Sequence, residues 1–227
     1  MNKILHIIPA AGKASRIGGI PKFLLPIGEE NFLIKFHVQN LLANIPNVKK
    51  VIAVSSENYE SVKRMDLNAE IIRVDTQTMN ETVSLVVQQY QEYENYVLTM
   101  PDTYYEDNLF MENLYKIHIQ NKHLITLGVW SAMEYQIGRL GQVMLNEEEV
   151  VDVVDKDINC KYKHVWGVIA WNKSINKYID NEDPHIGYIL KPALNNDINI
   201  KFTKATGTYF DCGTFSEYKR LIDNINS

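Results

Sequence analysis

Strand-like and helix-like segments alternate along the first part of this chain, which restricts the folds open to it. Apolar runs rich in β-branched residues are typical of buried strands, and they occur at residues 3–9, 49–55, 69–74, 95–100 and 123–130. Between them apolar side chains recur at helical spacing, as at Ile34, Val38 and Leu41. This order is typical of a mostly parallel sheet flanked by helices. We therefore predict an α/β fold with a doubly wound beginning.

The pattern changes after residue 138. Residues 141–154, GQVMLNEEEVVDVV, have the pattern of two strands around an acidic turn, and residues 163–172 that of another strand. We expect a small antiparallel lobe there. Because no low-complexity linker interrupts the chain, we predict a single domain over 1–227, with one half at about 1–137 and the other at about 138–227.

The bulk composition excludes several classes of protein. The chain of 227 residues is 45% hydrophobic and 22% charged, as is ordinary for a globular domain. No apolar run approaches the roughly 18 to 20 residues of a membrane helix, and the N-terminus has too little apolar length for a secretion signal. We therefore expect a cytoplasmic protein without a membrane partner. A net charge of −5 argues against a nucleic-acid binder, so an anionic ligand would have to be held by local charge.

Positive charge gathers in one loop after the first predicted strand. Residues 9–22, PAAGKASRIGGIPK, contain Lys13, Arg16 and Lys22, and no acidic residue occurs before Glu29. In open α/β sheets, ligands bind beyond the carboxyl ends of the strands. Lysine and arginine side chains at this place suit phosphate oxygens. Taken alone, the loop could also be an ordinary solvated surface loop.

The same loop is built from small residues. Ala10, Ala11 and Gly12 allow a base or a phosphate to approach the backbone and its N–H groups. The three glycines are not spaced as in a dinucleotide-binding fingerprint, and the loop has no GK[ST] sequence as in a Walker loop. We therefore predict an anion-binding loop of another kind.

The stretch PAAGKASRIGGIPKFLLPIG, residues 9–28, resembles the signature of sugar-phosphate nucleotidyltransferases of the glucose-1-phosphate thymidylyltransferase type. Its PAAG and PK segments are also similar to those of isoprenoid-pathway cytidylyltransferases. The resemblance implies a Rossmann-like nucleotidyltransferase (nucleotide-diphospho-sugar transferase) fold, with the nucleotide bound by the first half of the chain and the substrate by the second. It implies catalytic roles for Arg16 and Lys22, and nucleotide binding by Ala10, Ala11, Gly12 and Lys13.

Two aspartates, remote in sequence, resemble the paired metal ligands of that family. Asp102 follows an apolar strand, and Asp211 lies in TYFDCGT near the other end of the chain. Carboxylate oxygens suit Mg²⁺, which a nucleotidyl transfer needs to neutralise the α-phosphate, so the resemblance implies a magnesium cofactor. An aspartate after a strand is also a common turn former or helix cap, and that alternative stays open for Asp102 alone.

The middle of the chain carries weaker matches to the family. Thr82 corresponds to the position where the family reads the base at a helix start, although a hydroxyl there can equally cap the helix. Gly141, Asp155 and Lys156 match the residues that handle the sugar and its phosphate, and the resemblance therefore implies substrate binding by all three. A charged turn after a hairpin can also be a solvated edge.

Taken as a whole, the resemblance implies transfer of a nucleotidyl group from an NTP to a small phosphorylated acceptor, with release of pyrophosphate. The expected acceptor is a sugar 1-phosphate, and a pyrimidine NTP is favoured as the donor. A phosphate monoester is mostly dianionic at pH 7, so no general base is required. Polysaccharide biosynthesis would be the pathway. Two alternatives remain: a cytidylyltransferase acting on methylerythritol phosphate or phosphocholine, and a non-catalytic nucleotide-sugar binding protein. The oligomeric state is left open.

Overall fold

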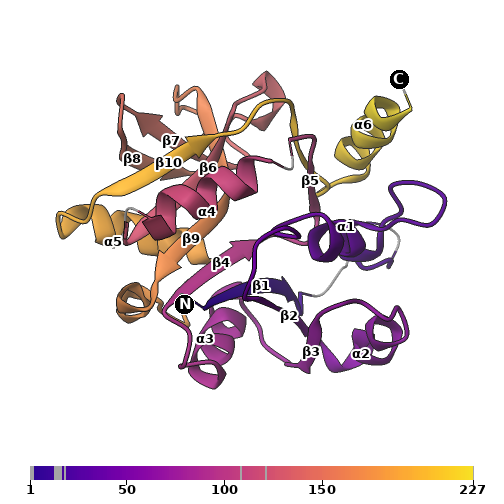
Figure 1. Ribbon diagram of the computed structural model, residues 1–227. Coiled ribbons are helices and arrows are strands. Elements are labelled where there is room, and N and C mark those ends of the chain that lie inside the picture. Colours follow the sequence, from indigo (N-terminus) through magenta and orange to yellow (C-terminus); the bar gives the residue numbers. More distant parts are fainter. Residues whose placement is uncertain (1–2, 13–16, 18, 108, 121, 227) are drawn as a thin grey trace.

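The computed structural model describes residues 3–12, 17, 19–107, 109–120 and 122–226. Its strands form a nine-stranded sheet in the order β3-β2-β1-β4-β9-β6-β10-β8-β7 and a separate two-stranded sheet, β11-β5 (Figure 1). The strands are β1 (Ile4–Ala10), β2 (Val48–Val54), β3 (Glu70–Arg73), β4 (Asn95–Thr99), β5 (Thr103–Tyr105), β6 (Ile125–Ser131), β7 (Gly141–Leu145), β8 (Glu149–Asp155), β9 (His164–Asn172), β10 (Ile200–Lys204) and β11 (Tyr209–Asp211).

The first half of the large sheet is parallel. Strand β1 pairs in parallel with β2 and β4, and β2 pairs in parallel with β3. Every residue of β1 is buried, because helices cover both faces of the sheet. The carboxyl ends of these strands therefore meet at one edge. The five strands that the sequence predicts in this part of the chain all overlap observed strands.

The second half is mostly antiparallel. Strand β9 runs antiparallel to β4 and β6, and β7 and β8 form the expected hairpin. Strand β7 also pairs with the start of β9, which closes this part of the sheet on itself. The hairpin thus continues the same sheet as the parallel strands and is held beside the start of β9.

Helices cover both faces of the sheet (Figure 1). They are α1 (Leu33–Gln39), α2 (Ser56–Lys63), α3 (Met79–Gln89), α4 (Phe110–Gln120), α5 (Leu190–Asn195) and α6 (Phe215–Ile225), with short 3-10 helices at Lys22–Leu24, Glu134–Gln136, Lys173–Tyr178 and Ile186–Ile189. Side chains of α3 and α5 share one apolar cluster with the sheet, and those of α1, α2 and α4 belong to clusters on the opposite face. Within the described ranges, no helix has the length and apolarity needed to span a membrane.

The small sheet joins two remote segments. Strand β11 lies antiparallel to β5, with Asp211 opposite Thr103 and Tyr209 opposite Tyr105. Both tyrosines are buried and pack their rings against Trp130, which anchors the pairing in the core. The Cys212 N–H also donates to the Asp102 carbonyl at 2.9 Å. The chain near residue 211 is thereby brought to the carboxyl end of β4.

Candidate active site

Two adjoining cavities lie where the parallel strands end, and Lys22, Met79 and Asp102 line both of them. We call the first the loop cavity; its wall consists of Pro9–Gly12, Lys22, Phe23, Thr76–Met79, Thr82, Pro101 and Asp102. We call the second the hairpin cavity; its wall includes Arg139–Gly141, Asp155, Lys156, Trp166, His185, Tyr209, Asp211 and Gly213. The predicted nucleotide residues and the predicted substrate residues therefore lie in neighbouring spaces.

Small residues at the end of β1 form one wall of the loop cavity. Ala10 and Ala11 are buried, and a Cβ added at Gly12 would meet no atom within 4 Å. The backbone is therefore accessible at Gly12, which is exposed. Lys13 and Arg16, the other two predicted residues of this loop, lie outside the described residues.

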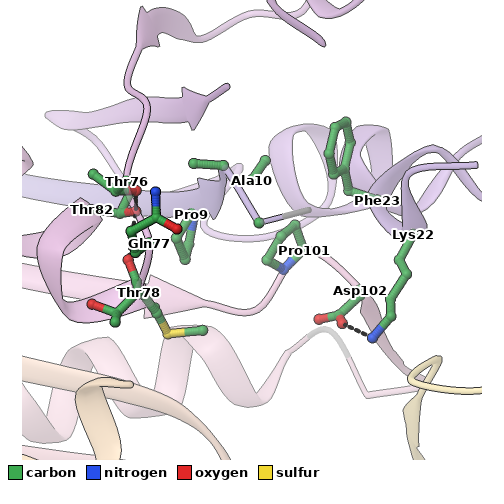
Figure 2. A pocket seen from close by; sticks show the side chains of 13 residues that line it. Pro9, Ala10, Lys22, Phe23, Thr76, Gln77, Thr78, Thr82, Pro101 and Asp102 are labelled. Carbon is green, nitrogen blue, oxygen red and sulfur yellow. Dashed lines mark hydrogen bonds and ion pairs between the residues drawn. The ribbon is translucent and has the colours of Figure 1, made fainter. Parts of the chain in front are cut away.

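The opposite wall of the loop cavity is the segment before α3. Figure 2 shows Thr76, Gln77 and Thr78 across from Lys22 and Asp102. Thr78 caps α3: its side chain accepts from Glu81 N at 3.0 Å, and the Glu81 carboxylate accepts from the Thr78 backbone in return. These three residues belong to the stretch 76–87 that corresponds to the family's base-reading segment, and a threonine three positions before a glutamate is also a recognisable capping signal.

Thr82 lies in the first turns of α3, but it is not the cap. Its hydroxyl donates to the Thr78 carbonyl at 3.1 Å and lies 2.6 Å from the Thr76 hydroxyl. The side chain is buried and still lines the loop cavity. The sequence left two roles open for Thr82, capping the helix and reading the base. Thr78 is the cap in the structure, and base reading by Thr82 stays a prediction.

Lys22 and Asp102 form an ion pair where the two cavities meet. Lys22 begins the short helix after Pro21, and Asp102 lies in the turn between β4 and β5. Lys22 Nζ is 3.2 Å from Asp102 Oδ2, and the two side chains are 18% and 29% exposed (Figure 2). The loop that carries Lys22 therefore faces Asp102, and both groups remain accessible from the cavities.

Asp211 is next to this pair. It lies opposite Thr103 in the small sheet and lines the hairpin cavity together with Asp102. Burial, followed by the negative charges of Asp102 and Glu217, raises the pKa of Asp211 to about 7, and Lys22 opposes that rise. The two predicted metal-binding aspartates are thus brought together, with more negative charge than Lys22 alone can neutralise.

This excess of negative charge fits a divalent cation. The described part of the chain has no group of three or more histidine, cysteine or acidic residues that could hold a metal. Mg²⁺ nevertheless often takes only one or two protein carboxylates and completes its shell with water and substrate phosphates. Asp102 and Asp211 provide such a pair.

All three predicted substrate residues line the hairpin cavity. Gly141 and Asp155 are paired across β7 and β8, and Lys156 follows directly. A Cβ added at Gly141 would lie 2.2 Å from Trp166 Nε1, so only glycine allows the indole to pack this close. The match to the family's glycine thus coincides with a steric requirement of this fold.

His185 and Arg139 are cavity residues that sequence reasoning missed. His185 Nε2 lies 3.2 Å from Asp155 Oδ2, and this contact holds the pKa of Asp155 below its usual range. Arg139 forms an ion pair with Glu217 at 3.8 Å, and the negative charge of Glu217 also raises the pKa of Asp211. No motif marks either residue, because each reaches the cavity through contacts between segments that are distant in sequence.

No protein-family model and no curated protein sequence matches the chain. Several solved structures, by contrast, are similar to it. A Bacillus anthracis protein described as a glucose-1-phosphate thymidylyltransferase, in complex with sucrose, has a TM-score of 0.83 at 16% identity, over 99% of this chain and 96% of the other. The inositol-1-phosphate CTP transferase of T. maritima has a TM-score of 0.76 at 19% identity, over 98% and 96%.

UDP-glucose pyrophosphorylase complexed with UDP-glucose has a TM-score of 0.77 at 16% identity, over 100% of this chain and 99% of the other. At such low identities these likenesses establish the fold. The chain therefore has the nucleotidyltransferase fold that its sequence predicts, shared with the sugar-phosphate nucleotidyltransferases that its motifs resemble.

Proposed function

We propose that the protein is a nucleotidyltransferase that joins an NTP to a sugar 1-phosphate and releases pyrophosphate. The observation that carries this proposal is the position of the Lys22–Asp102 pair at the junction of two cavities, with Asp211 beside it. A reaction between two phosphorylated substrates needs this arrangement, because the charges must act where the two substrates meet. The shared fold with solved nucleotidyltransferases supports the same reaction class.

The loop cavity would bind the nucleotide. Backbone N–H groups of Ala10, Ala11 and Gly12 can approach phosphate or base closely, because these residues carry little or no side chain. Lys13 and Arg16 follow in the sequence and would hold the departing pyrophosphate. Thr82 and the segment before α3 would contact the base, for which we propose a pyrimidine.

The chemistry would be an in-line displacement at the α-phosphorus. An oxygen of the acceptor phosphate forms a bond to that phosphorus while the bond to the bridging oxygen of the β-phosphate breaks, and pyrophosphate leaves. Lys22 would stabilise the charge that gathers on the α-phosphate and the incoming phosphate. The acceptor is already dianionic near pH 7, so no side chain has to remove a proton.

Asp102 and Asp211 would hold Mg²⁺. When bound, the ion would neutralise phosphate charge and template the displacement. The support for this assignment is that both carboxyl groups line the hairpin cavity and that the charge of Asp102 adds to burial in raising the pKa of Asp211. Lys22 then lies within reach of both a carboxylate ligand and the reacting phosphates.

The hairpin cavity favours a hydroxylated acceptor over phosphocholine. A quaternary ammonium group is usually recognised by exposed aromatic faces. Trp166 and Tyr209, the aromatic residues of this cavity, are only 4% and 3% exposed. Asp155, Lys156 and Arg139 instead offer charged hydrogen-bonding groups, which suit the hydroxyls and phosphate of a sugar phosphate.

The inositol-1-phosphate CTP transferase among the similar structures makes CTP with a cyclic polyol phosphate the second candidate pair. We place the reaction in the cytoplasm, as a supply of nucleotide sugar for polysaccharide biosynthesis.

A substrate panel tests the proposal. Pyrophosphate release is measured with each of four NTPs against glucose 1-phosphate, inositol 1-phosphate and phosphocholine, with and without Mg²⁺. We expect Mg²⁺-dependent release with a pyrimidine NTP and a hydroxylated acceptor. Release with phosphocholine alone would contradict the acceptor argument. Tight nucleotide binding without turnover for any pair would favour a nucleotide-sugar binding protein.

A further inference from the structure

The ring of His37, in α1, contacts both ends of the turn that carries Asp102. His37 Nδ1 is 3.0 Å from Thr99 Oγ1, and His37 Nε2 is 2.8 Å from the Thr103 carbonyl oxygen. Thr99 is the last residue of β4 and Thr103 the first of β5, so Asp102 lies between the two contacts. One imidazole therefore spans the turn.

The chemistry of the partners fixes the direction of each hydrogen bond. A carbonyl only accepts, so His37 Nε2 carries the hydrogen and, in a neutral ring, Nδ1 accepts from the Thr99 hydroxyl. Thr99 Oγ1 must then accept from His6 Nε2, 2.7 Å away. This leaves His6 Nδ1 as a bare acceptor, and that atom is indeed buried without a hydrogen-bond partner in the described structure.

Burial favours the neutral form of His6 and His37. Burial lowers the pKa of His37 to about 4 and the pKa of His6 well below its usual value. Both imidazoles are therefore uncharged near pH 7, as the chain from His6 through Thr99 to His37 requires.

The turn that His37 spans also sets the place of Asp211. Thr103, whose carbonyl accepts from His37, is the residue opposite Asp211 in the small sheet. The Asp102 carbonyl accepts from Cys212 N at 2.9 Å. A shift of the turn would therefore displace both carboxylates.

We propose that His37 is a positioning residue that holds the turn of Asp102, and through it Asp211, in place for a divalent cation. This inference rests on the cation site of the proposed function. His37 is fully buried and belongs to the wall of neither cavity, so it acts on the site through the turn. The competing explanation is a histidine that serves core packing alone.

Two substitutions separate these explanations. In His37→Gln the side-chain amide nitrogen can take the place of Nε2 and still donate to Thr103, whereas in His37→Asn the shorter amide reaches only the position of Nδ1. A matched control is His118→Asn: His118 is also buried, lies 3.0 Å from the Thr126 hydroxyl and lines neither cavity.

The measurement is Mn²⁺ binding to the full chain by electron paramagnetic resonance, with thermal unfolding in parallel. We expect His37→Asn to weaken Mn²⁺ binding by about tenfold or more, as loss of a supporting contact around a metal site typically does. His37→Gln should remain close to wild type. His118→Asn, whose amide can keep the contact to Thr126 from the Nδ1 position, should leave Mn²⁺ binding unchanged.

Several outcomes would overturn the inference. Normal Mn²⁺ binding in His37→Asn, or an equal loss in His118→Asn, would reduce His37 to a packing role while the cation site stands. A wild-type protein that binds no Mn²⁺ and releases no pyrophosphate would remove the cation site and the proposed function together. Nitrogen-15 NMR that places the proton of His37 on Nδ1 would reverse the deduced bond directions.

Discussion

The loop cavity and the hairpin cavity share a border but are assembled in different ways. Most of the loop cavity comes from two short continuous segments, the end of β1 and the start of α3. The hairpin cavity collects residues from the β7–β8 hairpin, β9, the segment before the helix at Ile186–Ile189, and β11. Its wall also carries more charged side chains. Backbone at strand and helix ends thus suits the phosphates, which all nucleotides share. Recognition of a particular acceptor instead requires side chains from segments that are distant in sequence.

The largest effect should come from Lys22, one of the three residues that line both cavities. We expect Lys22→Ala to lower turnover by about 10² to 10³, since a charge partner in a water-poor site contributes a few kcal/mol to transition-state stabilisation. Steady-state pyrophosphate release measures the loss, and circular dichroism checks the fold. Near-normal turnover would show that the shared border has no catalytic importance.

Asp211→Asn should separate activity from stability. We expect turnover to fall by about 10² or more, because one of two cation ligands is weakened. In metal-free buffer the variant should be as stable as wild type or more so, since a half-buried carboxylate that Asp102 repels is replaced by a neutral amide. A gain of 1 kcal/mol would raise the unfolding temperature by about 2 to 4 °C. A marked fall in the unfolding temperature would contradict this account.

Two glycine substitutions test the difference between the cavities directly. Gly141→Ala forces a methyl group against Trp166, and we expect about a tenfold rise in the acceptor KM and a loss of about 1 to 3 kcal/mol in stability. Gly12→Ala adds a methyl group in open space, so it should leave stability unchanged and raise only the nucleotide KM. Equal effects of both variants on the two KM values would show that the cavities do not act separately.

The smallest effect concerns a residue outside both cavities. Burial lowers the pKa of His118 to about 4, whereas the unfolded chain keeps the usual 6.5. The unfolded state therefore binds a proton first as pH falls, and the stability present above 6.5 is lost between 6.5 and 4. From pH 7 to pH 6 we expect His118 to account for a loss of roughly 0.5 to 1 kcal/mol. Urea unfolding of wild type and His118→Asn at both pH values should reveal it.

The sequence predicts the loop cavity better than the hairpin cavity, and the reason is physical. Ala10 to Gly12 and Lys22 belong to one continuous stretch, so a local pattern is enough to find them. Asp102 and Asp211 can be predicted because each lies near a strand end within a recognisable motif. His185 has no such signal, since its role depends on a contact with Asp155, and the span of His37 across a turn is visible only in three dimensions.

The strand pairing between β5 and β11 has a consequence for how this protein would fail. It holds one of the two carboxylates in place, yet each strand has only three residues and neither belongs to the nine-stranded sheet. Two-stranded sheets are marginal on their own, and such elements open locally before a whole domain melts. Mild heat or denaturant should therefore abolish activity while circular dichroism still reports a folded protein. The folded fraction of a sample would then be larger than its active fraction.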